Sequence, residues 1–465
     1  MIKKIDFRPI LNIVLLILFF GPLFYISRFI FLSTDDFCMA IKAYENFGGN
    51  FWEWYNYING RYINAVFALM PVYNLSVYRI IIITLILLLG GALFWFVQKL
   101  FYCYELQANF HKKLLLVILL YLVLIAQLPS LFEIFYWYSA AGPYLLSFIF
   151  LLLFLGAALT YFFKRKMNFL FFALVIILIN GNNEILILLT NFILMLLFLG
   201  DWIKRRELNN RLLVLNIISW LSSLAVILSP GTVSRRGLHD YGGDFIGSVK
   251  VSFFYGAKFI ILNLTQIPYL IFFLIVFLWI YNTVKDTEKR FIFPLYLLTI
   301  SYLSVTSVFF IVYYATGLFD VYVGRIGNMA GMLVFIFAFL NVFNFAVYLR
   351  SKSNYRILRS SYYSPVLISV LLVFLIFKNE NYVNIRKDIT EGNLVIYKDE
   401  MEKRFRLLAE SNEKTIILEP IEGTRILKSG DKYYVGQEWL QYWYTEYINI
   451  YLGKNFERIN INIQK

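Results

Sequence analysis

The sequence predicts an all-α protein that crosses a membrane many times. Of its 465 residues, 60% are hydrophobic and only 15% are charged, and the mean hydropathy is +0.67. Long apolar runs, several close to the roughly 20 residues that a spanning helix needs, alternate with short basic clusters. This composition and spacing are typical of a polytopic membrane protein and not of a soluble globular core.

About eleven apolar segments are predicted to span the membrane. They are roughly residues 10–31, 77–98, 114–129, 143–163, 168–180, 184–200, 212–229, 267–283, 291–313, 326–349 and 364–377. The first segment is too long for a removable signal peptide and lacks a small-residue cleavage site, so we expect it to be retained. Residues 244–265 carry Lys250 and Lys258 among aromatic residues, and we expect this stretch to lie at the membrane interface. If it spans instead, the topology after it would invert.

Positive charges predict the orientation of the chain. Lys3, Lys4 and Arg8 precede the first span, and basic clusters recur on every second side at 164–166, 204–206, 285–290 and 350–359. Such clusters face the cytoplasm. We therefore expect a multi-pass protein of the bacterial cytoplasmic membrane, with a cytoplasmic N-terminus and an extracytoplasmic C-terminus. The formal charge of +14 follows from this topology, so no nucleic-acid partner is expected.

The stretch from 167 to 200 is predicted to be a hairpin. As one helix it would measure about 50 Å, which is too long for one span, and both ends are flanked by basic clusters. The turn falls at "NGNN", residues 180–183. Because the first arm reaches only about 20 Å into a core of about 30 Å, the turn is expected in a recess with Asn183 and Glu184. Backbone at that depth is tolerated only against protein or water.

Residues 378–465 differ from the rest in being polar. "KTIILEP" predicts a strand, and the segment after Gln437 predicts a helix. We therefore expect two parts: a membrane domain, 1–377, and a small extracytoplasmic α+β domain, 378–465. The chain has two cysteines, too few for a disulfide framework.

Polar and charged residues gather on the predicted outer side. "STDDFCMA", residues 33–40, places two carboxylates directly after the first span, where an unpaired charge costs about 2.5–3.5 kcal/mol near the bilayer centre. The predicted site comprises Asp35, Asp36, Arg61, Glu133, Trp137, Tyr138, Asn183, Glu184, Arg235, Arg236, His239 and Arg325.

These residue types suggest transfer of a group from a lipid phosphate. Asp35 and Asp36 can act as a general base or as ligands of a divalent cation such as Mg²⁺ or Mn²⁺. Guanidinium groups match phosphate oxygens, so the arginines at 61, 235, 236 and 325 are expected to bind the donor phosphate. The other residues are expected to line the substrate cavity.

Structural alternatives stand beside these roles. The aspartates could cap a helix. Glu184 could be a structural partner of a buried arginine or of the asparagine cluster. Arg61, Arg235 and Arg236 could anchor lipid headgroups, and Arg325 could be a stop for its helix. Trp137 and Tyr138 could belong to an aromatic belt, and His239 could be an ordinary loop residue.

The motifs "DDF", "GRY" at 60–62, "YWYSAAGPY" at 136–144, "NGNNE", "SPG" with "RR", and the tail "GDKYYVGQEWLQYWYTEYINIYLG" occur in this order along nearly the whole chain. This arrangement resembles an uncharacterised bacterial membrane-protein family grouped with the GT-C class of membrane glycosyltransferases. The resemblance implies a polytopic GT-C-like fold, a polyprenyl-phosphate sugar donor and an outer-face site. It also implies that Asp35 is the base and that Asp36 orients it or binds a metal.

We therefore expect a glycosyltransferase that moves a sugar from a polyprenyl-phosphate donor to a cell-envelope glycan or lipid acceptor. A transporter or flippase of lipid-linked saccharides, or a polymerase, is the alternative. Transporters usually show internal repeats and charges near the midplane, whereas these charges gather near one face. The sequence has no glycine-rich nucleotide loop and no Cys/His metal motif, which disfavours a nucleotide-sugar donor.

Overall fold

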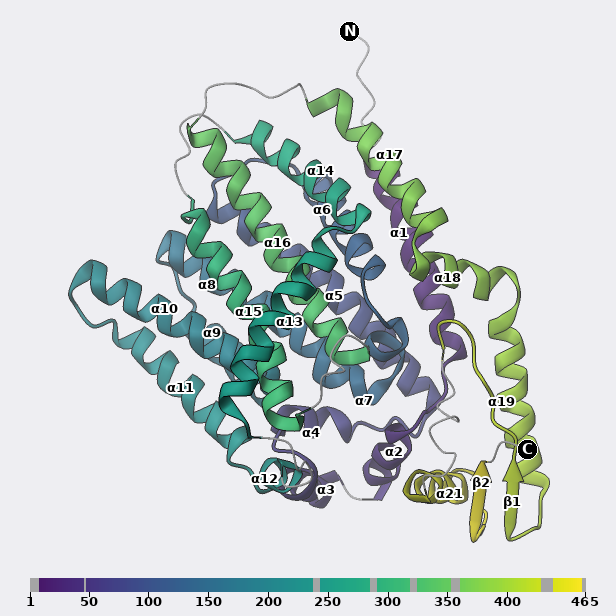
Figure 1. Cartoon of the computed structure of the whole chain (residues 1–465). Helices are drawn as coiled ribbons and strands as arrows, with labels where there is room; N and C mark the ends of the chain where they lie inside the picture. Colours follow the sequence, from purple (N-terminus) through teal and green to yellow (C-terminus); the bar gives the residue numbers. More distant parts are fainter. Residues whose placement is uncertain are drawn as a thin grey trace.

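The structure is a computed structural model that describes residues 8–45, 47–236, 243–284, 291–317, 324–352, 360–427 and 438–461. In this part the chain is a bundle of long helices with a small sheet near its C-terminal end (Figure 1). The helices of the first half are α1 (Arg8–Ile26), η1 (Ser27–Phe29), α2 (Asp35–Glu45), α3 (Phe47–Glu53), η2 (Trp54–Ile58), α4 (Tyr62–Ala68), α5 (Leu75–Cys103), α6 (Phe110–Ala126), η3 (Phe132–Tyr136), α7 (Tyr138–Ala140), η4 (Ala141–Leu146), α8 (Ser147–Lys164), α9 (Phe169–Asn182), η5 (Glu184–Leu186), α10 (Ile187–Arg205) and α11 (Asn210–Ile227). The second half contains α12 (Pro230–Arg236), α13 (Phe245–Leu264), α14 (Ile267–Thr283), α15 (Pro294–Thr316), α16 (Gly324–Lys352), α17 (Ser360–Lys378), α18 (Glu380–Thr390), α19 (Asn393–Glu410), β1 (Thr415–Leu418), α21 (Glu438–Leu452) and β2 (Arg458–Ile461).

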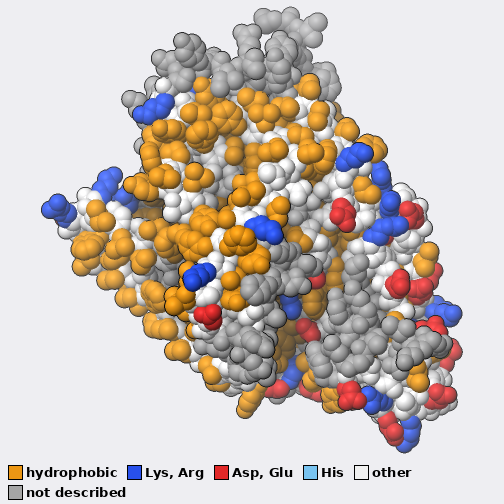
Figure 2. Space-filling view, in the orientation of Figure 1, with side chains coloured by type: hydrophobic (Ala, Val, Ile, Leu, Met, Phe, Trp, Pro, Cys, Tyr) orange, Lys and Arg blue, Asp and Glu red, His pale blue; other side chains and the backbone are white. Residues whose placement is uncertain are grey.

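The helices make this an all-α polytopic membrane protein, as predicted. Among the described residues, eight helices are long and apolar enough to cross a membrane, or nine if the bent pair 365–378 and 380–390 is one span. Hydrophobic side chains cover most of the face seen over α10, α11 and α13 to α15, whereas acidic and basic side chains gather at the lower right, over the C-terminal segment (Figure 2). A broad apolar surface of this kind suits contact with lipid.

Each of the eleven predicted spans coincides with a helix. Seven of them lie among the long apolar helices, while α9 and α14 are shorter, with 14 and 17 residues, and α6 has 17. The expectation of an interfacial helix at 244–265 is not supported, because α13 itself meets the length and composition of a span. It packs along α15.

Hydrogen bonds at the ends of the neighbouring helices show where α13 begins and where α15 begins. Gly243 donates its backbone N–H to the Tyr314 carbonyl at 2.8 Å, so α13 begins beside the end of α15. Asn344, near the end of α16, exchanges hydrogen bonds with the backbone of Ile292, just before α15. Since α15 and α16 run in opposite directions, and Arg350 at the end of α16 lies over Tyr281 at the end of α14, α13 begins and α14 ends at opposite ends of the bundle.

The predicted hairpin is present, whereas the depth of its turn in the membrane stays a prediction. α9 and α10 are joined at Asn183, and Arg165 at the end of α8 forms an ion pair with Asp201 near the end of α10 at 2.7 Å. The start of α9 and the end of α10 therefore lie at the same end of the bundle. The turn lies at the opposite end, where Gly181 packs against the Tyr62 ring of α4.

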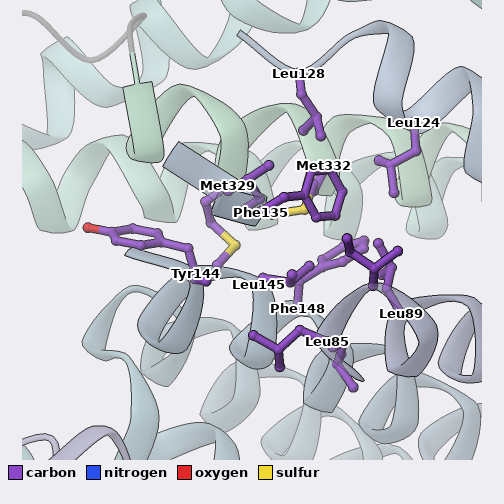
Figure 3. Close-up of a cluster of buried hydrophobic side chains, with 14 of the residues drawn as sticks. Leu85, Leu89, Leu124, Leu128, Phe135, Tyr144, Leu145, Phe148, Met329 and Met332 are labelled. Carbon is purple, nitrogen blue, oxygen red and sulfur yellow. The ribbon is translucent and has the colours of Figure 1, made fainter. Parts of the chain in front are cut away.

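The centre of the bundle is formed by α6, whose residues 116–126 are all buried. A helix that is apolar on every side is typical of a protein core or of a membrane span, and α6 packs against α1, α5 and α14. Figure 3 shows where this core continues under the polar end: Leu85 and Leu89 of α5 meet Met329 and Met332 of α16. Tyr144 borders the cluster, with its hydroxyl directed away from it (Figure 3).

The C-terminal segment combines helices with a two-stranded sheet. β1 pairs with β2 in parallel, with Thr415 opposite Arg458, and α21 precedes β2 and packs on it. The predicted strand and the predicted helix after Gln437 are both found. The rings of Tyr444 and Tyr447 in α21 contact Phe37 of α2, with centroids 5.0 and 4.9 Å away. The segment therefore covers the helix that begins with the two aspartates.

Candidate functional site

A loop between α6 and α8, residues 130–146, organises the lower end of the bundle in Figure 1. We call it the hub loop. It contains the π-helical turns η3 and η4. A third π-helical turn, η2, lies outside the hub loop and ends shortly before Arg61 in the sequence. Single π-helical turns are rare and concentrate at functional sites. Four groups of predicted site residues attach to the hub loop through the contacts described next.

Asp36 is fully buried, with no exposed surface. Its Oδ1 accepts a hydrogen bond from the Ser139 amide of the hub loop at 2.9 Å, and its Oδ2 accepts one from the Ser33 amide at 3.3 Å. The Tyr78 hydroxyl lies 3.2 Å from Oδ2. Burial raises the pKa of Asp36 to about 7, and the hydrogen bonds only partly counteract this effect.

The hydrogen bonds around Tyr78 favour a protonated Asp36. The Tyr78 hydroxyl donates to the Tyr136 carbonyl at 2.7 Å, and it accepts from the Tyr138 amide at 3.2 Å. A hydroxyl has one proton to donate. Its contact with Asp36 is therefore best satisfied by a proton on the carboxyl group, in agreement with the raised pKa.

Asp35 is the first residue of α2 and is partly exposed. Adjacent helical residues point about 100° apart, so Asp35 turns away from the contacts that hold Asp36. Thr34, just before it, has a positive φ of 46°, a region that β-branched residues rarely occupy. Strained backbone of this kind persists only where its surroundings hold it, as Asp36 does here through Ser33 and Ser139.

Arg61 and Glu184 form a bidentate ion pair. Arg61 Nε and Nη2 donate to the two oxygens of Glu184, and Arg61 is nearly buried. The hydroxyl of Tyr144 from the hub loop lies beside the guanidinium. Pairing of Glu184 with a buried arginine, one of the two alternatives, is thus the observed arrangement. Arg61 could bind a phosphate only if this pair opened.

The recessed turn is fixed to the hub loop by asparagines. Asn182 donates to the Gly142 carbonyl at 2.8 Å, and Asn183 donates to the Pro143 carbonyl at 2.7 Å. Both asparagines are fully buried. The expectation that Asn183 lines an open cavity is corrected by this burial: its amide supports the turn that presents Glu184.

Tyr138 also differs from expectation. It is fully buried, its ring stacks on Phe67 at 4.6 Å, and its hydroxyl donates to the Phe67 carbonyl. It therefore belongs neither to an aromatic belt nor to an open substrate cavity, because the loop folds this side chain inward between α4 and α5.

Arg325, Trp137 and Glu133 form a second cluster on the hub loop. The Arg325 guanidinium lies 5.1 Å from the Trp137 ring centroid, a cation–π distance, and its backbone N–H donates to Glu133 at 2.6 Å. Gly324 has a φ of +73°, and a Cβ there would lie 2.4 Å from a Glu133 oxygen. Within the described part of the chain, no carboxylate lies within ion-pair distance of the Arg325 guanidinium.

The remaining predicted residues lie partly outside the described structure. Arg235 and Arg236 end α12, which packs against η2, but their side chains are outside the described residues, as is His239. A cavity shared by Asp35, Glu184 and these arginines thus stays a prediction. Two grooves lined by described residues at this end of the molecule contain none of them.

The carboxylates do not form a metal-binding set among the described residues. No group of three or more His, Cys, Asp or Glu side chains is placed there to share an ion. Asp36 already accepts two amide hydrogen bonds and has a raised pKa, whereas a metal ligand must be deprotonated. We derive no step through a metal.

Two residues at this end, Tyr78 and Arg79, were not predicted from the sequence. Arg79 is partly buried and donates to the Ile30 carbonyl at 3.3 Å, and its guanidinium lies 5.8 Å from the Phe31 ring centroid. Its Nε has no partner in the described part of the chain. A lone arginine at the start of the apolar run "RIIII" was the available signal, because such a charge rarely lacks a task.

Comparison with models of protein families, with curated proteins and with solved structures found no match. Function is therefore inferred from the geometry of the site: a partly exposed carboxylate, a buried carboxyl group that fixes it, and arginines at the same end of a membrane helix bundle.

Proposed function

We propose that the protein is a glycosyltransferase of GT-C type that moves a sugar from a polyprenyl-phosphate donor to a cell-envelope glycan or lipid acceptor. The observation that carries the proposal is the arrangement of the two aspartates. Asp36 is buried, accepts hydrogen bonds from Ser33 and Ser139 and has a raised pKa, while Asp35 beside it on α2 is partly exposed. Two carboxyl groups whose environments differ in this way are typical of acid–base sites.

In the proposed reaction, Asp35 takes the proton of an acceptor hydroxyl. The acceptor oxygen forms a bond to the anomeric carbon while the bond from that carbon to the phosphate oxygen breaks. The phosphate keeps the electron pair and leaves as a lipid phosphate monoester, and the anomeric carbon is inverted. Asp36 does not touch the reacting atoms and acts as a positioning residue.

Negative charge grows on the departing phosphate, so cations near it would accelerate the reaction. Arg325 and Arg79 are the candidates among the described residues, since neither has a carboxylate within ion-pair distance there, whereas Arg61 is already paired with Glu184. Arg235 and Arg236 stay candidates from the sequence.

The finer topology also belongs to this proposal. We propose eleven passages, with α13 and α14 counted as one, in the bacterial cytoplasmic membrane. The basic clusters 164–166 and 204–206 lie at the end of the bundle opposite the hub loop and mark the cytoplasmic side. The hub loop and the C-terminal segment then face the outside, where a lipid-linked sugar meets an envelope acceptor.

The test is an assay in proteoliposomes with a polyprenyl-phosphate sugar radiolabelled in the sugar. We expect the label to appear in an acid-stable glycan or glycolipid, together with an equal amount of free lipid phosphate. Label that crosses the membrane while still attached to its lipid would instead support the transporter alternative.

A further inference from the structure

A groove lined by tyrosines lies beside the aspartates. It has a volume of ≈ 440 Å³, within the range of about 300–1,000 Å³ common for small-molecule sites. We call it the tyrosine groove, and its lining is Ala40, Ile41, Tyr44, Tyr73, Asn74, Leu75, Ser76, Tyr447, Ile450 and Tyr451. These residues come from three places in the chain: α2, the start of α5 with the residues before it, and α21.

The tyrosines present broad ring surfaces in the groove. Tyr44 and Tyr73 meet edge to face with centroids 5.5 Å apart, and Tyr447 and Tyr451 stack at 5.5 Å with 15° between their planes. Tyr44 is 60% exposed and Tyr451 is 47% exposed, so these two rings are open to a ligand. Each pair thus joins one exposed ring to a more buried one, and exposed aromatic surface in a groove often marks a binding site.

Polar groups lie between the rings. Asn74 caps α5 by accepting the Ser76 amide at 2.9 Å, and both side chains are exposed at the edge of the groove. The side-chain NH₂ of Asn74 donates to no residue in the described part of the chain. The groove thus combines flat aromatic surfaces with amide and hydroxyl groups.

Among the residues that the structure describes, no charged side chain lines the groove. An anionic ligand such as a phosphate would find no cation there, and a purely apolar lipid chain would leave the amide and hydroxyl groups without partners. A pyranose ring fits both surfaces: its C–H bonds meet the negative face of an aromatic ring, and its hydroxyls bind amide and hydroxyl groups.

The groove begins on the two helices that hold Asp36. Ala40 follows Asp36 by one turn of α2, about 6 Å along the helix axis, and Ser76 precedes Tyr78 by two residues in α5. The groove therefore begins within two turns of Asp35, which starts the same helix, although Tyr44 and Asp35 lie on opposite faces of α2.

We propose that the tyrosine groove binds a neutral saccharide, namely the glycan of the acceptor. This inference rests on the proposed glycosyl transfer and assigns the acceptor, as opposed to the donor, to this groove. The donor's phosphate would bind elsewhere, toward the arginines and the lipid.

The test measures binding without any donor, so that it is independent of transfer. Saturation-transfer-difference NMR is recorded on the purified full chain in detergent with a library of neutral oligosaccharides: chito-, cello- and malto-oligosaccharides of two to six units. Protein resonances are irradiated in the aromatic region. The variants are Tyr44→Ala and Tyr451→Ala, and the matched control is Tyr57→Ala, a tyrosine that is 76% exposed and lies outside the groove.

We expect at least one oligosaccharide to receive saturation from the wild type and from Tyr57→Ala, and to lose it at least five-fold in each groove variant. Thermal denaturation of all four proteins controls for folding. Equal signals in all four proteins, no signal from any oligosaccharide, or signals from detergent chains alone would overturn the proposal. Binding that survives in a protein unable to transfer sugar would reject the proposed function and leave the groove assignment standing.

Discussion

Asp36 carries a titration that can be measured without knowing the substrate. Its pKa is raised to about 7 chiefly by burial, from an ordinary value of 3.8. Between these two pH values the folded protein binds a proton that the unfolded chain releases. The stability contributed by this group is therefore greatest below pH 4, falls as the pH rises to about 7, and is constant above that.

Asp36→Asn should remove this pH dependence. Asparagine resembles the neutral acid: its oxygen can accept from Ser139, and its NH₂ can donate to Tyr78, although the bond from Ser33 is lost. We expect the difference in melting temperature between the variant and the wild type to shift in favour of the variant as the pH rises from 5 to 8. The full effect is bounded by roughly 4 kcal/mol, three pKa units at 1.36 kcal/mol each. A difference that does not change with pH would contradict a neutral Asp36.

The pair formed by Arg61 and Glu184 gives a second prediction for single residues. Arg61→Ala would leave a carboxylate in a polar but largely enclosed site, and we expect a loss of roughly 2–4 kcal/mol in stability. Arg61→Lys should lose less stability, because lysine keeps the positive charge but cannot make both hydrogen bonds to Glu184. Arg211→Ala, at an exposed arginine in α11, is the control and should stay within about 0.5 kcal/mol of the wild type. Thermal denaturation in detergent measures the stability of all three variants. Equal losses of stability in Arg61→Ala and Arg211→Ala would contradict a structural role for the ion pair.

Among the elements, the turn between α9 and α10 depends on close packing against α4. A Cβ at Gly181 would lie 2.2 Å from the Tyr62 ring, so Gly181→Ala must displace that ring or the turn. Because the neighbouring asparagines bind the hub loop, we expect a loss of about 1–3 kcal/mol in stability.

Gly200→Ala is the matched control for this prediction. Gly200 lies in α10, and a Cβ at this position would meet no described atom within 4 Å, so alanine should stabilise the helix by roughly 0.5–1 kcal/mol. Melting temperatures of the two variants should therefore move in opposite directions. A Gly181→Ala protein as stable as the wild type would show that the turn is looser than the structure indicates.

Hydrophobic length and basic clusters were sufficient to predict the long apolar helices, because both signals are local in the sequence, but not the shorter helices α3, α4, α18 and α19. Local signals also predicted the hairpin turn at 180–183 and the strand near Thr415. Lys250 and Lys258 favoured an interfacial position for α13, whereas this helix of 20 residues also meets the length and composition of a span, so its place in the membrane stays a prediction.

The site was less predictable for a physical reason. Which way a side chain points depends on the π-helical turns of the hub loop, and these leave no period in the sequence. Tyr138 was therefore expected at a surface although it is buried, and Tyr78, the partner of Asp36, was not expected at all.

For the whole molecule, the proposal requires the two ends of the bundle to lie on opposite sides of the membrane. In a protein with both native cysteines, Cys38 and Cys103, replaced by alanine, single cysteines can be introduced at Tyr57 and at Lys166, both exposed. A membrane-impermeant maleimide should label position 57 in intact cells and position 166 only after permeabilisation. Labelling of both positions from the same side would contradict the proposed topology.

The most direct test of the central claim is the rate of sugar transfer by the Asp35→Asn protein. Asparagine keeps the size of the side chain but cannot accept the proton of the acceptor, so we expect a loss of about 10²- to 10⁴-fold in the proteoliposome assay, with expression and melting temperature unchanged. Glu45→Gln, at an exposed carboxylate near the other end of the same helix, should keep the wild-type rate. An Asp35→Asn protein that transfers sugar as fast as the wild type would contradict the assignment of Asp35 as the base.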